Sequence, residues 1–129
     1  MITVKNLEEW GACPSAIDVL RANGGKCGIK KAIRLCDKND PNWLTWLMST
    51  PVCGELIRAG VDPNTHDQWN NTPLHFAAFR GRWEMCQSLL NYGANVNARN
   101  ARGCTPLSYA EHLKNTNTSK LLKEHGGTL

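Results

Sequence analysis

The 129 residues suit one compact domain that can bury about two-thirds of the surface exposed on unfolding. Hydrophobic residues make up 41% and charged residues 20% of the chain, which is typical of a folded globular protein and excludes a disordered tail. The net charge of +4 favours an acidic partner over a basic one, yet it falls well short of the charge typical of nucleic-acid-binding proteins.

Cysteine and histidine residues are numerous but lack the spacing of a metal site. The six cysteines include no C-x-x-C pair, and the four histidines have no ligand spacing with one another or with a cysteine pair. The first residues form no apolar signal segment, and no later run approaches membrane-spanning length. We therefore expect reduced thiols in a cytoplasmic protein that needs no metal, cofactor or membrane.

Residues 1–36 predict a helical module. A short helix is expected at residues 7–10, and a longer one begins at Pro14 and stops at Gly24-Gly25. In residues 29–40, apolar side chains at helical spacing form one face, and Lys30 and Lys31 lie outside it. This module does not share the repeat pattern of the residues that follow it in the chain.

Two tryptophans, Trp43 and Trp46, follow in "DPNWLTWLMS". They could line a ligand pocket or stack on bases. Apolar residues packed this densely on a short helix are more often core, and we expect them to fill the seam between the helical module and the residues that follow it.

The rest of the chain is repetitive, since Thr72-Pro73-Leu74 recurs as Thr105-Pro106-Leu107. The same offset relates Asp67 to Asn100, Ala77 to Ala110, Leu89 to Leu56 and Leu122, and Gly93 to Gly60 and Gly126. This constant offset predicts three repeats. Neither helix of one repeat can bury both its sides, so neighbouring repeats must stack on each other, and residues 1–36 are expected to cap the stack.

Each repeat predicts two helices. In "NTPLHFAAF", Thr72 can cap a helix whose first turn tolerates Pro73, because the N–H that proline lacks would be unbonded there. Gly81 ends this helix. The second helix, "WEMCQSLLNYG", carries one apolar stripe and closes at Gly93; the stripe consists of Met85, Cys86, Leu89 and Leu90.

These motifs resemble the ankyrin repeat family, above all "TPLHFAA" and "LLNYGANVNA". The resemblance covers residues 37–129 and implies an all-α solenoid of a degenerate repeat at 37–66, a full repeat at 67–99 and a C-terminal repeat at 100–129. It also implies that His75 bonds to the Thr72 side of its turn. The chain departs from the pattern at Asn70, where the turn usually has glycine, at Ser108, which replaces the motif histidine, and in the first repeat, which lacks Thr-Pro-Leu-His. The leader at 1–36 is weakly similar to those of some phage and bacterial repeat proteins.

The resemblance places the family's concave binding surface at the turn tips and on the exposed side of each first helix. In this chain those positions are Gln68, Trp69, Asn71, Phe79, Arg80, Ala101, Arg102, Cys104 and His112. Exposed aromatic residues beside arginine are enriched in binding hot spots, so we expect a partner to bind here.

The function predicted from the sequence is a non-enzymatic protein-interaction module, because no catalytic cysteine–histidine arrangement, phosphate loop or nucleophile elbow is present. A short binder without an effector domain is expected to occlude or bridge its partner, as a phage or mobile-element inhibitor of a host factor would. The first alternative is a binder of nucleic acid or another anionic surface through Arg80, Arg82, Arg99 and Arg102. The second is self-association through stacked repeats.

Overall fold

The computed structural model describes residues 1–40 and 42–129, and it divides into two compact units, Met1–Leu44 and Thr45–Leu129. The described chain is mostly helical, which confirms the expected all-α class. The domain boundaries at 36, 66 and 99 and the capping role of residues 1–36 stay predictions. None of the described helices is long and apolar enough to cross a membrane.

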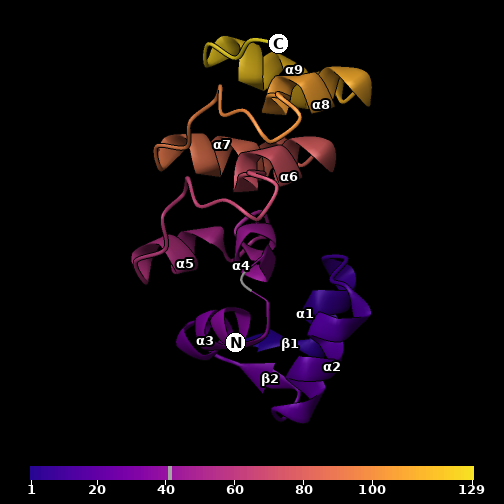
Figure 1. Cartoon of the computed structure of the whole chain (residues 1–129), viewed down its shortest axis with the longest axis vertical. Coiled ribbons are helices and arrows are strands. Elements are labelled where there is room, and N and C mark those ends of the chain that lie inside the picture. Colours follow the sequence, from indigo (N-terminus) through magenta and orange to yellow (C-terminus); the bar gives the residue numbers. More distant parts are fainter. Residues whose placement is uncertain (41) are drawn as a thin grey trace. The chain divides into compact units, whose positions relative to one another are not determined.

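The first unit combines helices with a small sheet (Figure 1). The helices are α1 (Val4–Glu9), α2 (Pro14–Ala22) and α3 (Ile29–Asn39). Strands β1 (Ile2–Thr3) and β2 (Lys26–Cys27) pair antiparallel, with Ile2 opposite Cys27. The sequence did not predict these strands, because such short segments cannot show an alternating pattern.

Helix α1 begins earlier than the predicted residue 7. Thr3 caps it, since the Thr3 hydroxyl accepts a hydrogen bond from the Asn6 N–H at 3.2 Å while the Asn6 side chain accepts one from the Thr3 N–H at 2.9 Å. This reciprocal box satisfies two backbone groups that helix ends otherwise leave unpaired, and it fixes the helix start at Val4.

Helix α4 (Asn42–Leu47) spans the division between the units, and further helices follow in the second unit. They are α5 (Cys53–Arg58), α6 (Pro73–Phe79), α7 (Trp83–Asn91), α8 (Pro106–His112) and α9 (Thr116–Glu124). Figure 1 shows α6 and α7 in one layer and α8 and α9 in the next. Helix α6 packs on α8, and α7 packs on both α9 and α5. Each layer therefore buries the apolar face of its neighbour.

The core of the stack follows the predicted stripe. Leu74, Ala77, Cys86 and Leu89 are fully buried, as are Leu56 and Leu122, which are the equivalents of Leu89 in the preceding and following repeats. Met85 and Leu90 are only half-buried, because they lie at the flanks of the stripe. Thr72 caps α6 as predicted, and Thr105, its equivalent one repeat later, caps α8; each is followed by proline in the first turn.

The turn between the helices of a repeat requires a left-handed residue, which is Gly81 in the central repeat (φ 67°) and Lys114 in the next (φ 57°). A Cβ atom on Gly81 would lie 2.9 Å from the Asn115 side-chain oxygen of the following layer. Glycine at position 81 adopts this angle without the strain that Lys114 bears in the next repeat, and it leaves room for the Asn115 side chain.

Candidate functional site

Two turns that precede α6 and α8 form the base of the candidate site. Asp67 opens the first turn, and its Oδ1 atom accepts hydrogen bonds from the N–H groups of Trp69 and Asn71, both at 2.9 Å. Asn100 opens the second turn, and its Oδ1 atom accepts from Arg102 and Cys104, both at 3.0 Å. The repeat offset that relates Asp67 to Asn100 therefore relates two turns of the same hydrogen-bonded geometry.

Backbone geometry also agrees between the turns. Asn70 has a φ of 59° and Gly103 one of 75°. The turn needs a left-handed residue at this place, and asparagine tolerates that conformation better than most residues other than glycine. This explains how the chain departs from the usual glycine at position 70 without losing the turn.

Neighbouring turns are joined through their main chains and side chains. The Ala101 N–H donates to the Trp69 carbonyl at 2.9 Å, and the Asn100 side-chain amide donates to Asn71 Oδ1 at 2.9 Å. These bonds fix the spacing of the two turn tips, so the surface between them is held in place before any partner arrives.

His75 makes a third connection. Its Nδ1 atom accepts a hydrogen bond from the Thr72 N–H at 3.0 Å, and its Nε2 atom therefore carries the proton and donates to the Cys104 carbonyl at 2.8 Å. The bond to Thr72 confirms the role that the family resemblance implied. Burial lowers the pKa of His75 from its ordinary value of 6.5, although the Cys104 carbonyl and the charge of Asp67 act in the opposite direction.

Two adjoining depressions lie above these turns, and together we call them the aromatic groove. The first, about 310 Å³, is lined by Trp69, Asn71, Asn100, Ala101, Arg102 and Tyr109. The second, about 280 Å³, is lined by Asn71, His75, Phe76, Phe79, Arg102 and Tyr109. Trp69 and Phe79 are more than half exposed, at 56% and 54%. The groove thus combines exposed aromatic rings with one guanidinium group.

The structure brings five of the nine predicted contact residues to this groove: Trp69, Asn71, Phe79, Ala101 and Arg102. Gln68, Arg80 and His112 are exposed but do not line either depression. Cys104 is half-buried, and both of its backbone polar groups are engaged within the turn region. Its part in the site is therefore structural support for His75 and Asn100.

Tyr109 is a groove residue that the sequence reading missed. Its ring packs edge-on against Phe79 at a centroid distance of 5.9 Å and against His75 at 6.0 Å. Its hydroxyl oxygen accepts a hydrogen bond from the Asn100 amide at 2.7 Å. Tyr109 is the equivalent of Phe76 one repeat later, and the structure shows that Phe76 lines the groove as well.

The four arginines of the nucleic-acid alternative differ in their surroundings. Arg99 donates to the Gly103 carbonyl at 2.7 Å and to the Leu129 carbonyl at 3.3 Å. Burial, and then the charge of Arg80, lower the pKa of Arg82. Only Arg102 lines the groove. Of the four guanidinium groups, that of Arg99 is therefore bonded to the chain's own backbone.

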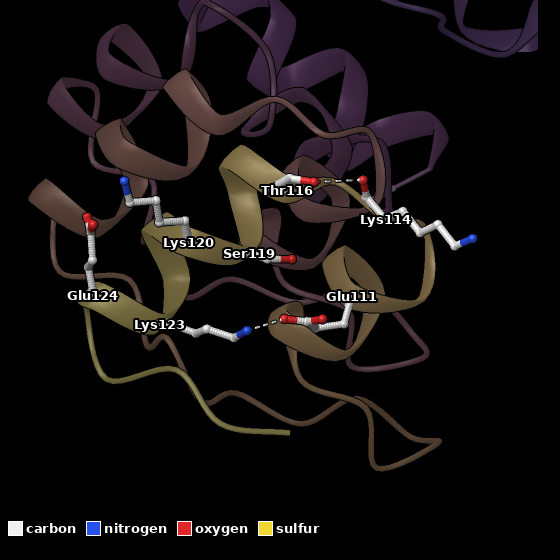
Figure 2. Close-up of a pocket in the computed structure, with 7 residues that line it drawn as sticks. All are labelled: Glu111, Lys114, Thr116, Ser119, Lys120, Lys123 and Glu124. Atoms are coloured by element: carbon white, nitrogen blue, oxygen red, sulfur yellow. Dashed lines mark hydrogen bonds and ion pairs between the residues drawn. The ribbon is translucent and has the colours of Figure 1, made fainter.

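The outer face of α8 and α9 carries a separate depression of about 610 Å³. Figure 2 shows Lys123 of α9 directed toward Glu111 of α8, and their ion pair measures 2.6 Å. The depression is lined by Glu111, Lys114, Thr116, Ser119, Lys120, Lys123 and Glu124. The equivalents of Glu111, Ser119 and Lys123 in the preceding repeat are Ala78, Cys86 and Leu90. The face that is small and apolar in the central repeat is therefore polar in the last one.

Thiols and possible metal ligands are the remaining reactive side chains. All six cysteines are free, and burial raises the pKa of Cys36 and Cys86 to about 12, so these two thiols are inert. Within residues 1–40 and 42–129, no group of three His, Cys, Asp or Glu side chains could hold a metal ion.

Comparison with known proteins identifies the repeats. Residues 56–110 match the family model of ankyrin repeats in many copies. These repeats belong to the ankyrin repeat family. Ankyrin repeats are generally non-enzymatic and mediate binding between proteins, so the chain carries a protein-interaction module.

Relatives of this chain share the repeats in very different contexts. The chain is 40% identical over 67 residues to ankyrin repeat protein FPV244 of Fowlpox virus, which is 52% of this chain and 10% of that protein. It is 41% identical over 70 residues to human ankyrin repeat and SOCS box protein 11 (54% and 21%) and 38% identical over 87 residues to human Rabankyrin-5 (58% and 7%). The similarity therefore spans about half of this chain and a small part of each relative.

Proposed function

We propose that the ankyrin repeats bind one protein partner through the aromatic groove and the turn tips beside it. The observation that carries this proposal is the pair of exposed rings, Trp69 and Phe79, beside Arg102. Large aromatic side chains that are exposed do not contribute to the hydrophobic core. Together with arginine, they are the side chains that dominate the binding energy of protein interfaces.

Rigidity of the groove supports the same proposal. The turn tips are joined by three hydrogen bonds between repeats: Ala101 to Trp69, Asn100 to Asn71, and His75 to Cys104. A surface held in this way loses little conformational entropy on docking. The module then acts by occluding or bridging its partner, without enzymatic activity and without a cofactor.

The partner is expected to present an acidic surface, because the groove contains Arg102 and its lining residues include no carboxylate. A nucleic-acid partner is disfavoured, since Arg99 is bonded to backbone carbonyls and the net charge is only +4. A phage or mobile-element origin, a cytoplasmic location and self-association stay predictions from the sequence.

Affinity capture tests the proposal. The intact chain is immobilised, proteins from the native host are captured, and their retention is quantified by mass spectrometry for three versions of the chain. The variant Trp69→Ala with Arg102→Glu should lose the partner, with at least about 2 kcal/mol lost at a hot-spot tryptophan, while its thermal stability changes little because both side chains are exposed.

The control is Lys30→Glu with Lys31→Glu, an exposed pair on α3. It should retain the partner. If the control loses the partner while the groove variant keeps it, the binding surface lies on the first unit and the proposal is wrong. A steep loss of binding between low and physiological salt would instead indicate nucleic acid.

A further inference from the structure

Asn100 sets the polarity of the groove. Its Oδ1 atom accepts from two backbone N–H groups, those of Arg102 and Cys104, so the amide orientation is fixed by atoms that can only donate. The other end of the amide, Nδ2, therefore points its two hydrogens to Asn71 Oδ1 at 2.9 Å and to the Tyr109 hydroxyl oxygen at 2.7 Å.

Tyr109 consequently has a proton to give. Because its oxygen accepts from Asn100, the hydroxyl hydrogen must be directed elsewhere. Among the described residues no hydrogen bond donated by this hydroxyl is found, and Tyr109 lines both halves of the groove. The phenol thus acts toward the groove as a hydrogen-bond donor.

Two further donors face the same space. The Arg102 guanidinium is exposed and lines both depressions. Asn71 has its oxygen occupied by Asn100, and its amide nitrogen makes only a long contact of 3.4 Å with Asp67 Oδ2. The groove lining contains no carboxylate that could accept hydrogen bonds from these donors. A ligand must therefore bring acceptors.

The walls on either side are apolar. Trp69 borders the first depression, and Phe76 and Phe79 border the second. A ligand that fills the groove must present apolar groups to both ends and an acceptor group near its middle. An extended peptide with one acidic residue between apolar residues has this pattern.

We propose that the aromatic groove binds an aspartate or glutamate side chain of a partner peptide, with Arg102 and Tyr109 donating to its carboxylate and flanking apolar side chains on Trp69 and Phe79. This inference rests on the proposed function and specifies the partner's chemistry. A carboxylate suits the groove better than a phosphate, because one guanidinium matches a single negative charge, whereas a phosphate dianion is usually held by several cations.

The test begins with selection from a random peptide library on the intact chain. The tightest peptide is synthesised with blocked termini, and each acidic residue is replaced in turn by its amide or by phosphoserine. Dissociation constants are measured by calorimetry. Replacing one acidic residue by its amide should weaken binding about tenfold or more, because hydrogen bonds to a charged group are lost.

Protein variants locate that carboxylate. Tyr109→Phe keeps the ring against Phe79 and removes only the hydroxyl, and Arg102→Gln replaces the charged guanidinium by a shorter, neutral amide. Each variant should bind the acidic peptide about tenfold more weakly and the amide peptide less than about threefold more weakly than the native chain does. Arg80→Gln is the matched control, since Arg80 is an exposed arginine outside the groove lining, and it should leave both affinities unchanged. Circular dichroism verifies that each variant is folded.

Contradictory outcomes fall into distinct groups. Equal affinity of the acidic and amide peptides, or much tighter binding of phosphoserine, would overturn the carboxylate assignment while groove binding stands, provided that Trp69→Ala still abolishes binding. Failure to select any peptide that depends on Trp69 would overturn both this inference and the proposed function. Because the peptide replacements need no protein variant, the test holds even if Tyr109→Phe does not fold.

Discussion

Replacing His75 by serine should reveal how strongly the imidazole couples the two repeats. Serine is the residue that the chain itself has at the equivalent position 108, where its hydroxyl lies 3.3 Å from the Thr105 N–H and preserves the cap. The substitution therefore keeps the cap but removes the bond from His75 Nε2 to the Cys104 carbonyl, together with the contact between the imidazole and the Tyr109 ring.

The magnitude follows from two losses. The Cys104 carbonyl accepts a part-buried hydrogen bond from His75 and loses its donor in the variant. An unsatisfied acceptor of this kind lowers the free energy of unfolding by about 1–3 kcal/mol. The imidazole is 1% exposed, so its removal also leaves a cavity. Together we expect a loss of about 2–4 kcal/mol in the free energy of unfolding near pH 7.5.

Dependence on pH gives an independent check. Burial lowers the pKa of folded His75 below the value of 6.5 in the unfolded chain, so the unfolded chain binds the proton first. The contribution of His75 to stability is complete above pH 6.5 and is lost as the pH falls through and below that value. The difference in the free energy of unfolding between the native chain and the His75→Ser variant should therefore become smaller as the pH falls.

Urea unfolding followed by circular dichroism, at pH values between about 7.5 and 5, measures this difference directly, because all other titrating groups cancel between the proteins. A difference below about 0.5 kcal/mol at pH 7.5, or one that stays constant as the pH falls, would refute the reasoning.

Three further predictions concern packing and thiol chemistry. Leu89→Ala should lower the free energy of unfolding by about 2–5 kcal/mol, because Leu89 is fully buried; a loss under about 1 kcal/mol in urea titrations would show that it does not pack between layers. Gly81→Ala should cost about 1–2 kcal/mol or more in the same assay, from its left-handed φ and the approach of Asn115, and an unchanged midpoint would contradict this. In the native protein at pH 8, a thiol reagent should label exposed Cys13 rapidly and buried Cys86 only on unfolding; equal rates would disprove the burial that raises the pKa of Cys86 to about 12.

Local rules predicted the repeat helices well. Thr72 and Thr105 were recognisable as caps because a threonine before proline satisfies backbone groups in a way that depends on neighbouring residues alone. The buried leucines were predictable because a constant offset between repeats makes equivalent positions share one environment. The capping signal lies within a few neighbouring residues, and the leucine signal recurs at a constant offset along the sequence, so both can be recognised without the structure.

Features that depend on contacts between distant residues escaped prediction. The sheet of β1 and β2 pairs Ile2 with Cys27, and no local pattern announces such a short pairing. Tyr109 was overlooked because in the sequence it is one more apolar residue inside a helix, whereas its donor role follows from the amide orientation of Asn100. Seven of the nine predicted contact residues are exposed, whereas Asn71 and Cys104 are half-buried. Only the structure shows that Gln68, Arg80 and His112 lie outside the groove lining.

The polar face of α8 and α9 has a consequence for assembly. Head-to-tail contacts between identical molecules produce rings where the rotation between copies closes and open filaments where it does not. A second copy that stacked on this face would have to strip water from Glu111 and Lys123, whose ion pair is now largely hydrated, and such desolvation commonly exceeds the attraction that is recovered. The ion pair of Glu111 and Lys123 therefore makes the stacking of a second copy on this face energetically costly.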